Sequence, residues 1–130
     1  MIYLDAGTTY TKIISKNETI NNIVPVKTGG NLNYYIIDSK DLKNLKLNIT
    51  AACGHMTGGI TNENEIIALA KGAKKYIEND ATILDLGSRD AKWVSFMDGK
   101  FHDMDWNTSC ASSTGATAEM LLKFYDLSVD

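Results

Sequence analysis

The 130-residue chain has few of the features that mark membrane, secreted or fibrous proteins. It contains one proline and two cysteines, so neither a proline-rich linker nor a disulfide framework is expected. No apolar run approaches the roughly 18 to 20 residues that span a bilayer, and no export signal opens the chain. We therefore expect a cytoplasmic protein that is not bound to a membrane, with Cys53 and Cys110 as reduced thiols.

Clustered positive charge is also scarce. The chain has 13 Lys and Arg against 16 Asp and Glu, which gives a net charge of −3, and its basic residues are scattered. Because no basic stripe is present to neutralise a phosphate backbone, we expect no nucleic-acid partner. The hydrophobic fraction of 44% and the charged fraction of 22% are typical of a globular protein, and the length fits one domain or two small lobes.

One eight-residue pattern is present twice. Residues 5–12 and 85–92 share the frame Asp-x-Gly-Ser/Thr-x-x-x-Lys, and each copy follows a short apolar run. Each copy predicts a strand ending in a carboxylate, a glycine turn where backbone N–H groups can approach an anion, and a second strand carrying a lysine. Such a carboxylate can hold a hydrated cation, and the hydroxyl and ammonium groups suit phosphate. The duplication predicts two lobes that face one polyphosphate.

The remaining periodicity predicts a repeated α/β lobe. We expect strands at residues 1–4, 11–15, 19–26, 47–52, 82–86, 92–97 and 100–104. The segment 33–46 is ambiguous: residues 34–37 look strand-like, and residues 39–42 could open a short helix. A helical period begins at Asn62 and places Ile66, Leu69, Ala70, Ala73 and Ile77 on one face, and a second helix follows Thr114. Asp98-Gly99 predicts a tight hairpin between the last two strands.

Six segments of the chain, in order, resemble the activators of 2-hydroxyacyl-CoA dehydratases and the related ATPase subunits of benzoyl-CoA reductase. The segments are residues 5–12, 28–31, 52–55, 65–73, 82–92 and 107–115. The resemblance implies a ribonuclease H-like (actin-like ATPase) α/β fold. It places the first lobe with its connecting helix in residues 1–80, and the first part of a second lobe in residues 81–130.

The resemblance also implies an activity. In that family ATP turnover drives low-potential electron transfer from a [4Fe–4S] cluster, shared by two subunits, to a dehydratase or reductase partner. We therefore expect ATP or ADP with Mg²⁺ and a homodimer. Glu65 would orient the attacking water, Asp5 and Asp85 would hold Mg²⁺ through water, and Cys110 would ligate iron. The residues expected to bind the phosphates are Gly7, Thr8, Thr9, Lys12, Gly87, Ser88, Arg89, Asp90 and Lys92.

The chain departs from the family pattern in several places. Ser88-Arg89 stands where the family has Gly-Gln, and Leu69 stands where its connecting helix has His. The family's second cluster cysteine and its adenosine-binding turn would lie beyond Asp130. We therefore expect an incomplete second lobe in this chain.

Two alternatives stay open. A small-molecule kinase of the same superfold, acting on pantothenate or a sugar, would share both phosphate turns, although the segment around Cys110 speaks against it. A non-enzymatic module for nucleotide sensing or dimer assembly would keep the fold without the chemistry. Cys53 and His55 provide too few ligands for a metal site. Trp93 and Trp106 are expected to pack in a core or interface.

Overall fold

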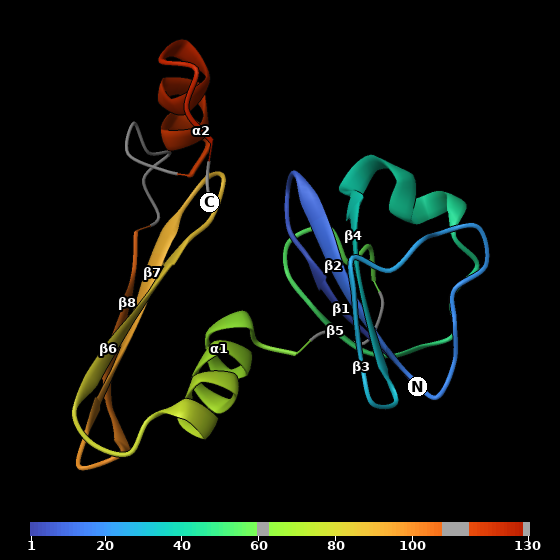
Figure 1. The fold of residues 1–130 in the computed structure, drawn as a ribbon. Coiled ribbons are helices and arrows are strands. Elements are labelled where there is room, and N and C mark those ends of the chain that lie inside the picture. Colours follow the sequence, from blue (N-terminus) through green and yellow to red (C-terminus); the bar gives the residue numbers. More distant parts are fainter. Residues whose placement is uncertain (60–62, 108–114, 129–130) are drawn as a thin grey trace. The chain divides into compact units, whose positions relative to one another are not determined.

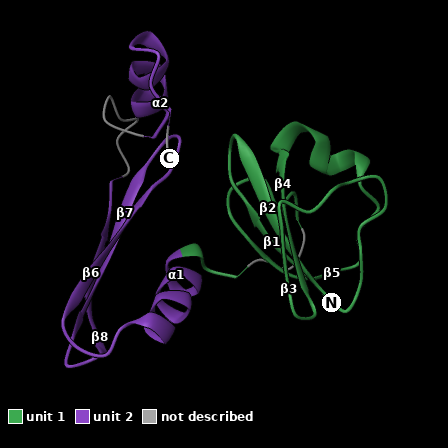
Figure 2. Cartoon of the chain, viewed as in Figure 1, with its two compact units in different colours: residues 1–65 green, residues 66–130 purple. Residues whose placement is uncertain are grey.

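The computed structural model describes residues 1–59, 63–107 and 115–128 (Figure 1). The chain divides into two compact units, Met1–Glu65 and Ile66–Asp130 (Figure 2). Each unit is built around its own β-sheet. The boundary falls at the start of the helix that follows residue 64, so nearly all of that helix belongs to the second unit.

The first unit contains a five-stranded sheet. Its elements are β1 (Ile2–Ala6), β2 (Tyr10–Lys16), β3 (Lys27–Gly29), β4 (Leu32–Asp38), the 3₁₀ helix η1 (Ser39–Asn44) and β5 (Ile49–Cys53). The strand order is β3-β4-β2-β1-β5, in which β5 lies parallel to β1 and the other neighbours are antiparallel. The antiparallel run β1-β2-β4 forms the centre of the unit.

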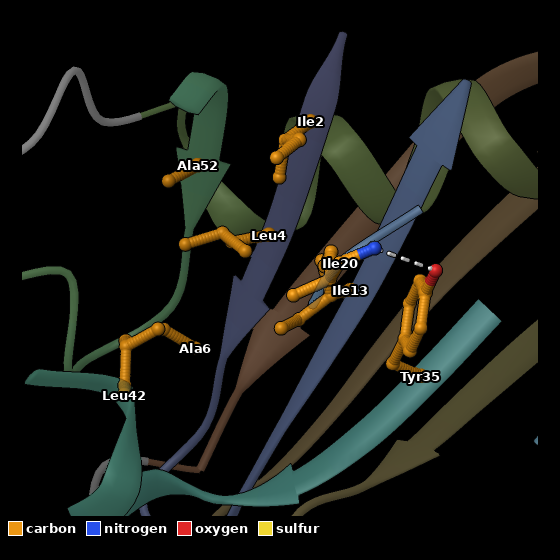
Figure 3. Packing of buried hydrophobic residues seen from close by; sticks show 8 residues of the cluster. All are labelled: Ile2, Leu4, Ala6, Ile13, Ile20, Tyr35, Leu42 and Ala52. Atoms are coloured by element: carbon orange, nitrogen blue, oxygen red, sulfur yellow. Dashed lines mark hydrogen bonds between the residues drawn. The ribbon is translucent and has the colours of Figure 1, made fainter. Parts of the chain in front are cut away.

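One face of this sheet carries the core of the first unit. Alternate residues of β1 point to this face, and the rest of the cluster comes from β2, β4, β5, η1 and Ile20, which lies between β2 and β3 (Figure 3). The buried residues are Ile2, Leu4, Ala6, Ile13, Ile20, Tyr35, Leu42 and Ala52. The Ile20 amide donates a hydrogen bond of 3.1 Å to the Tyr35 hydroxyl, so the polar atom of the buried tyrosine side chain has a partner. The opposite face of β1 and β2 therefore carries Asp5 and Lys12.

The strand predicted at residues 19–26 is wrong. This segment is irregular, because Asn22 has a positive φ of 67° and Pro25 has no backbone N–H for a sheet ladder. Pairing instead begins at β3, which turns through Gly30 (φ 59°) into β4. The strand-like segment at 34–37 and the short helix at Ser39 are both confirmed, as parts of β4 and η1.

The second unit contains an antiparallel sheet of three strands, in the order β6-β7-β8. Its elements are β6 (Ala81–Leu86), β7 (Ala91–Met97), β8 (Lys100–Trp106) and α2 (Gly115–Phe124), preceded by α1 (Glu65–Ala73) and the 3₁₀ turn η2 (Lys74–Tyr76). Asp98 and Gly99 form the predicted turn between β7 and β8, with positive φ values of 49° and 67°. The predicted apolar face of α1 is confirmed for Ile66, Leu69, Ala70 and Ala73, which pack in the cluster of Val94 and Phe96. The helical position predicted for Ile77 is wrong, because the helix ends at Ala73 and Ile77 packs on the same cluster with an extended backbone after η2.

The two sheets bury opposite faces of their repeated hairpins. In β1, Leu4 and Ala6 are buried, at 5% and 0% exposure. In β6, the equivalent Leu84 and Leu86 are 60% and 56% exposed. The α1 helix instead packs with the face of Val94, which lies on the same side of β7 as Lys92. The second Asp–Lys pair therefore lies beside a core, and the first does not.

Within the described ranges, neither α1 nor α2 is long and apolar enough to cross a bilayer.

Candidate phosphate-binding site

The two copies of the repeated sequence pattern form hairpins with the same register. Asp5 of β1 is paired with Lys12 of β2, and Asp85 of β6 is paired with Lys92 of β7. Residues directly opposite each other on antiparallel strands point to the same face. Each hairpin therefore places a carboxylate and an ammonium group side by side at the end of its first strand. The predicted strand–turn–strand structure of both copies is confirmed.

The glycine of each copy lies where neighbouring atoms approach closely. A Cβ atom on Gly7 would lie 2.8 Å from the Tyr10 carbonyl oxygen. A Cβ atom on Gly87 would lie 2.8 Å from Asp90 Oδ1 and 3.0 Å from the Asp90 carbonyl oxygen, to which the Gly87 amide donates at 2.8 Å. The first turn therefore leaves no room for a side chain at Gly7, whereas a side chain at Gly87 would require the Asp90 side chain to move and the turn to shift slightly.

In the first hairpin the charged groups are accessible. Lys12 Nζ lies 3.0 Å from Asp5 Oδ2, and the side chains of Lys12 and Asp5 are 64% and 37% exposed. An ion pair this exposed contributes little to stability, because water screens it and long side chains lose entropy in forming it. The Lys12 ammonium group can therefore move to another anion at small cost.

A buried hydroxyl holds the first turn against η1. Ser39 Oγ donates to the Gly7 carbonyl oxygen at 2.6 Å, and the Ser39 amide donates to the Thr9 carbonyl oxygen at 2.9 Å. Because the Ser39 proton is used in this way, the hydroxyl of the buried Thr11 donates to Ser39 Oγ, at 2.9 Å. These bonds fix the backbone on both sides of Thr8, whose own side chain is exposed.

Asp38 caps η1 and helps to place Ser39. Its Oδ1 accepts a hydrogen bond of 3.0 Å from the Lys40 amide, and its Oδ2 lies 2.9 Å from Lys40 Nζ. The side-chain hydrogen bond from Lys40 lowers the pKa of Asp38 and raises the pKa of Lys40. The cap therefore stays ionised at neutral pH.

On the other side of Asp5, the end of β5 approaches closely. Cys53 is paired with Asp5 across the parallel ladder, and its thiol donates to Asp5 Oδ1 at 4.0 Å. Directly after it, Gly54 has φ 97°, and a Cβ there would lie 2.5 Å from the Ala6 carbonyl oxygen. The Met56 amide donates to that same oxygen at 2.9 Å. Residues 52–55 are one of the six segments that resemble the family, and they lie against β1, the strand that carries Asp5.

In the second hairpin the lysine is buried. Lys92 is 2% exposed, and its Nζ lies 3.2 Å from Asp90 Oδ1 and 3.8 Å from Asp85 Oδ2. It also lies 5.3 Å from the centre of the Trp106 ring, which β8 places directly across from it. The Trp106 indole Nε1 donates to Asp90 Oδ2 at 2.8 Å. Lys92, Asp90 and Trp106 therefore contact one another in a closed triangle.

The other predicted site residues are placed as follows. Thr9 is exposed in the first turn, and in the second turn Ser88 is half-buried while Arg89 is exposed. Glu65 is the first residue of α1 and half-buried, a position where the helix dipole favours an anion. Cys110, the predicted iron ligand, lies outside the described residues. The roles assigned to these residues from the sequence stay predictions.

The donor set suits a hydrated Mg²⁺ ion better than a fully protein-bound metal. Among the described residues, no group of three His, Cys, Asp or Glu side chains lies close enough to hold a metal ion. Each hairpin nevertheless presents a partly exposed carboxylate, Asp5 in the first and Asp85 in the second, both 37% exposed. Mg²⁺ in nucleotide sites keeps several waters and takes one or two protein carboxylates.

Two residues of the site were missed by sequence reasoning. The sequence suggested only that Ser39 opens a short helix. Its contacts with the turn depend on the connection between β4 and η1, which could not be assigned from the sequence because the pattern of residues 33–46 is ambiguous. Trp106 was expected to pack in a core or interface, but its indole N–H reaches Asp90. A strand register for β8 would have revealed this contact, because Trp106 is paired with Lys92.

These features define a mixed α/β protein with a five-stranded and a three-stranded sheet, each carrying one Asp–Gly–Lys hairpin. No family profile matches the chain. No curated protein matches its sequence. Among solved structures, the chain is similar to component A of (R)-2-hydroxyglutaryl-CoA dehydratase from Acidaminococcus fermentans, with a TM-score of 0.64 and 18% sequence identity.

The similarity covers 98% of this chain and 54% of that one, so the chain spans about half the length of the solved structure. At this level of identity the likeness concerns the fold. It supports the fold family that the six sequence segments indicated.

Proposed function

We propose that the chain binds the phosphates of ATP or ADP, together with Mg²⁺, through its two glycine hairpins. The observation that carries the proposal is the shared register, which sets Asp5 opposite Lys12 and Asp85 opposite Lys92. A single Asp–Gly hairpin is common for conformational reasons alone. Two with the same register, each with a glycine in a close contact, support a shared chemical purpose.

In the first hairpin, the Lys12 ammonium group would leave Asp5 for a phosphate oxygen. The hydroxyls of Thr8 and Thr9 and the backbone around Gly7 would donate hydrogen bonds, with Ser39 fixing the turn. In the second hairpin we assign the same task to Gly87, Ser88 and Arg89. Asp5, Asp85 and Asp90 would hold Mg²⁺ through water, and the bound ion would neutralise charge on the phosphates. Glu65 would orient an attacking water.

We further propose that the chain belongs to an ATP-driven activator. The support is the fold similarity to component A of a 2-hydroxyacyl-CoA dehydratase and the order of the six motifs. The activator would act as a homodimer and pass low-potential electrons to a dehydratase- or reductase-type partner. The [4Fe–4S] cluster and its ligand Cys110 are assigned from the sequence resemblance.

Nucleotide binding is tested by calorimetric titration with Mg-ADP and by thermal unfolding. A ligand present at about 100 times its Kd stabilises the folded state by about 2.7 kcal/mol. Lys12→Met should weaken binding about tenfold or more, because a hydrogen bond to a charged group is lost. The control is Lys16→Met, which removes an ammonium group from the same face of the same strand. Equal affinities for the two variants, or no binding by the unaltered chain, would refute the proposal.

The electron-transfer role needs a separate experiment. After anaerobic purification, iron content and visible absorption should show a cluster, and Cys110→Ser should remove both. An iron-free protein that transfers phosphate from ATP to a small alcohol would instead favour the kinase alternative. An iron-free protein that binds Mg-ADP without turnover would favour the nucleotide-sensing module.

A further inference from the structure

The two lysines of the repeated hairpins occupy opposite environments. Both are paired with the aspartate of their own hairpin. The Lys12 side chain is 64% exposed, whereas that of Lys92 is 3% exposed. A buried ammonium group is tolerated only where opposite charges and hydrogen bonds compensate for lost water. Lys92 therefore cannot turn outward to an incoming phosphate as easily as Lys12.

The partners of Lys92 provide this compensation. Its ammonium group lies 3.2 Å from Asp90 and 3.8 Å from Asp85. The Trp106 ring, 5.3 Å away, adds a cation–π contact and covers the group. Lys92 precedes Val94 and Phe96 on the buried face of β7, so its aliphatic stem extends the core.

Asp90 is fixed on three sides. Oδ1 contacts Lys92, Oδ2 accepts the indole N–H of Trp106 at 2.8 Å, and the missing side chain of Gly87 leaves the space that Oδ1 fills. The side chains of Asp90 and Asp85 are still 30% and 37% exposed. Each carboxylate is thus held from within the unit while part of it faces solvent.

We propose that Lys92 is a positioning residue, which acts with Trp106 to hold Asp85 and Asp90 in place for a hydrated Mg²⁺ ion. This inference rests on the proposed nucleotide binding and assigns Lys92 a role other than that of a phosphate ligand. The two hairpins then have different roles. The first supplies an ammonium group to phosphate through Lys12, and the second supplies two carboxylates that share a single buried counterion.

The experiment compares ADP affinity in Mg²⁺ with ADP affinity in Ca²⁺, measured by calorimetric titration. Mg²⁺ demands near-ideal octahedral geometry, whereas Ca²⁺ tolerates irregular ligands. Both ions carry the same charge. The loss of a lysine's positive charge should therefore change both affinities by the same factor, and this factor cancels in their ratio. The unaltered chain should prefer Mg²⁺. Lys92→Met should lower the ratio about tenfold, as expected when a group that orients metal ligands is lost.

Lys12→Met is the matched control. It should weaken ADP binding equally in both metals and leave the ratio unchanged. The inference is overturned if Lys92→Met behaves like Lys12→Met, if it changes neither affinity, or if the unaltered chain shows no preference for Mg²⁺. Failure of the proposed function has a different signature, because the unaltered chain would then bind ADP in neither metal.

A second variant covers the case in which Lys92→Met does not fold. Trp106→Phe keeps a ring over the buried ammonium group and removes the N–H donor to Asp90. It should also lower the Mg²⁺-to-Ca²⁺ ratio, and an unchanged ratio in this variant would contradict the inference. In a Trp93→Phe background, the emission of Trp106 should change on addition of Mg-ADP, because its indole N–H contacts Asp90. Constant emission under saturating Mg-ADP would likewise overturn it.

Discussion

Ser39 and Gly7, which are 32 residues apart in sequence, are joined by a hydrogen bond of 2.6 Å from the serine hydroxyl to the glycine carbonyl oxygen. The bond links the start of η1 to the turn between β1 and β2. Through Thr11, it extends into the buried face of β2. The conformation of the turn therefore depends on a residue outside the repeated sequence pattern.

Ser39→Ala should reduce both stability and nucleotide binding. The variant removes the donor to Gly7 and the acceptor for the buried Thr11 hydroxyl, which should cost about 1–3 kcal/mol of unfolding free energy. Ser15→Ala is the control, because Ser15 is also buried and donates at 2.6 Å to the Glu18 carbonyl oxygen, far from the turn. Urea unfolding should show similar losses for both variants. Only Ser39→Ala should weaken Mg-ADP binding, and an equal effect from Ser15→Ala would contradict this role.

Gly54→Ala should destabilise the first unit more than Gly59→Ala. The two glycines have similar positive φ values, 97° and 92°. An alanine at either position should therefore lose about 1 kcal/mol of unfolding free energy to backbone strain. A Cβ at Gly54 would also lie 2.5 Å from the Ala6 carbonyl oxygen, whereas a Cβ at Gly59 would meet nothing within 4 Å. The additional clash should raise the total loss of unfolding free energy for Gly54→Ala to about 3 kcal/mol. Equal midpoints in urea for the two variants would show that β5 can move away from β1.

Lys92→Met and Lys12→Met should differ strongly in stability. Methionine preserves most of the aliphatic stem, so the comparison isolates the ammonium group. The exposed pair of Lys12 with Asp5 should contribute about 0–1 kcal/mol. Loss of the buried Lys92 leaves Asp85 and Asp90 without their counterion, which should cost about 2–4 kcal/mol, below the usual value for buried pairs because both carboxylates are partly solvated. Similar unfolding free energies for the two variants would show that the buried pair contributes no more than the exposed one.

The sequence predicted the hairpins well because their signals are local. Asp5, Gly7 and Lys12 lie within eight residues, and the same spacing recurs at Asp85. The helical face of α1 was also predictable, since its period is set by neighbouring turns. The irregular segment at 19–26 was not, because its apolar residues suggested a strand while Asn22 and Pro25 set the backbone.

The different environments of the two lysines could not be predicted from the repeated pattern. Burial of Lys92 depends on which face of its sheet α1 packs with and on the register of β8, which sets Trp106 opposite it. Both are long-range properties. The same local frame therefore gave an exposed ammonium group at Lys12 and a buried one at Lys92.

The pairing of Asp5 with Lys12 also determines how the turn between β1 and β2 can change in length. Side chains on a strand alternate between faces with a period of two. One residue inserted after Gly7 would rotate Lys12 toward the core side of the sheet and bring the small, buried Thr11 position to the outside. The turn can therefore vary in composition at its exposed threonines, but a single inserted or deleted codon would separate the carboxylate from its ammonium partner.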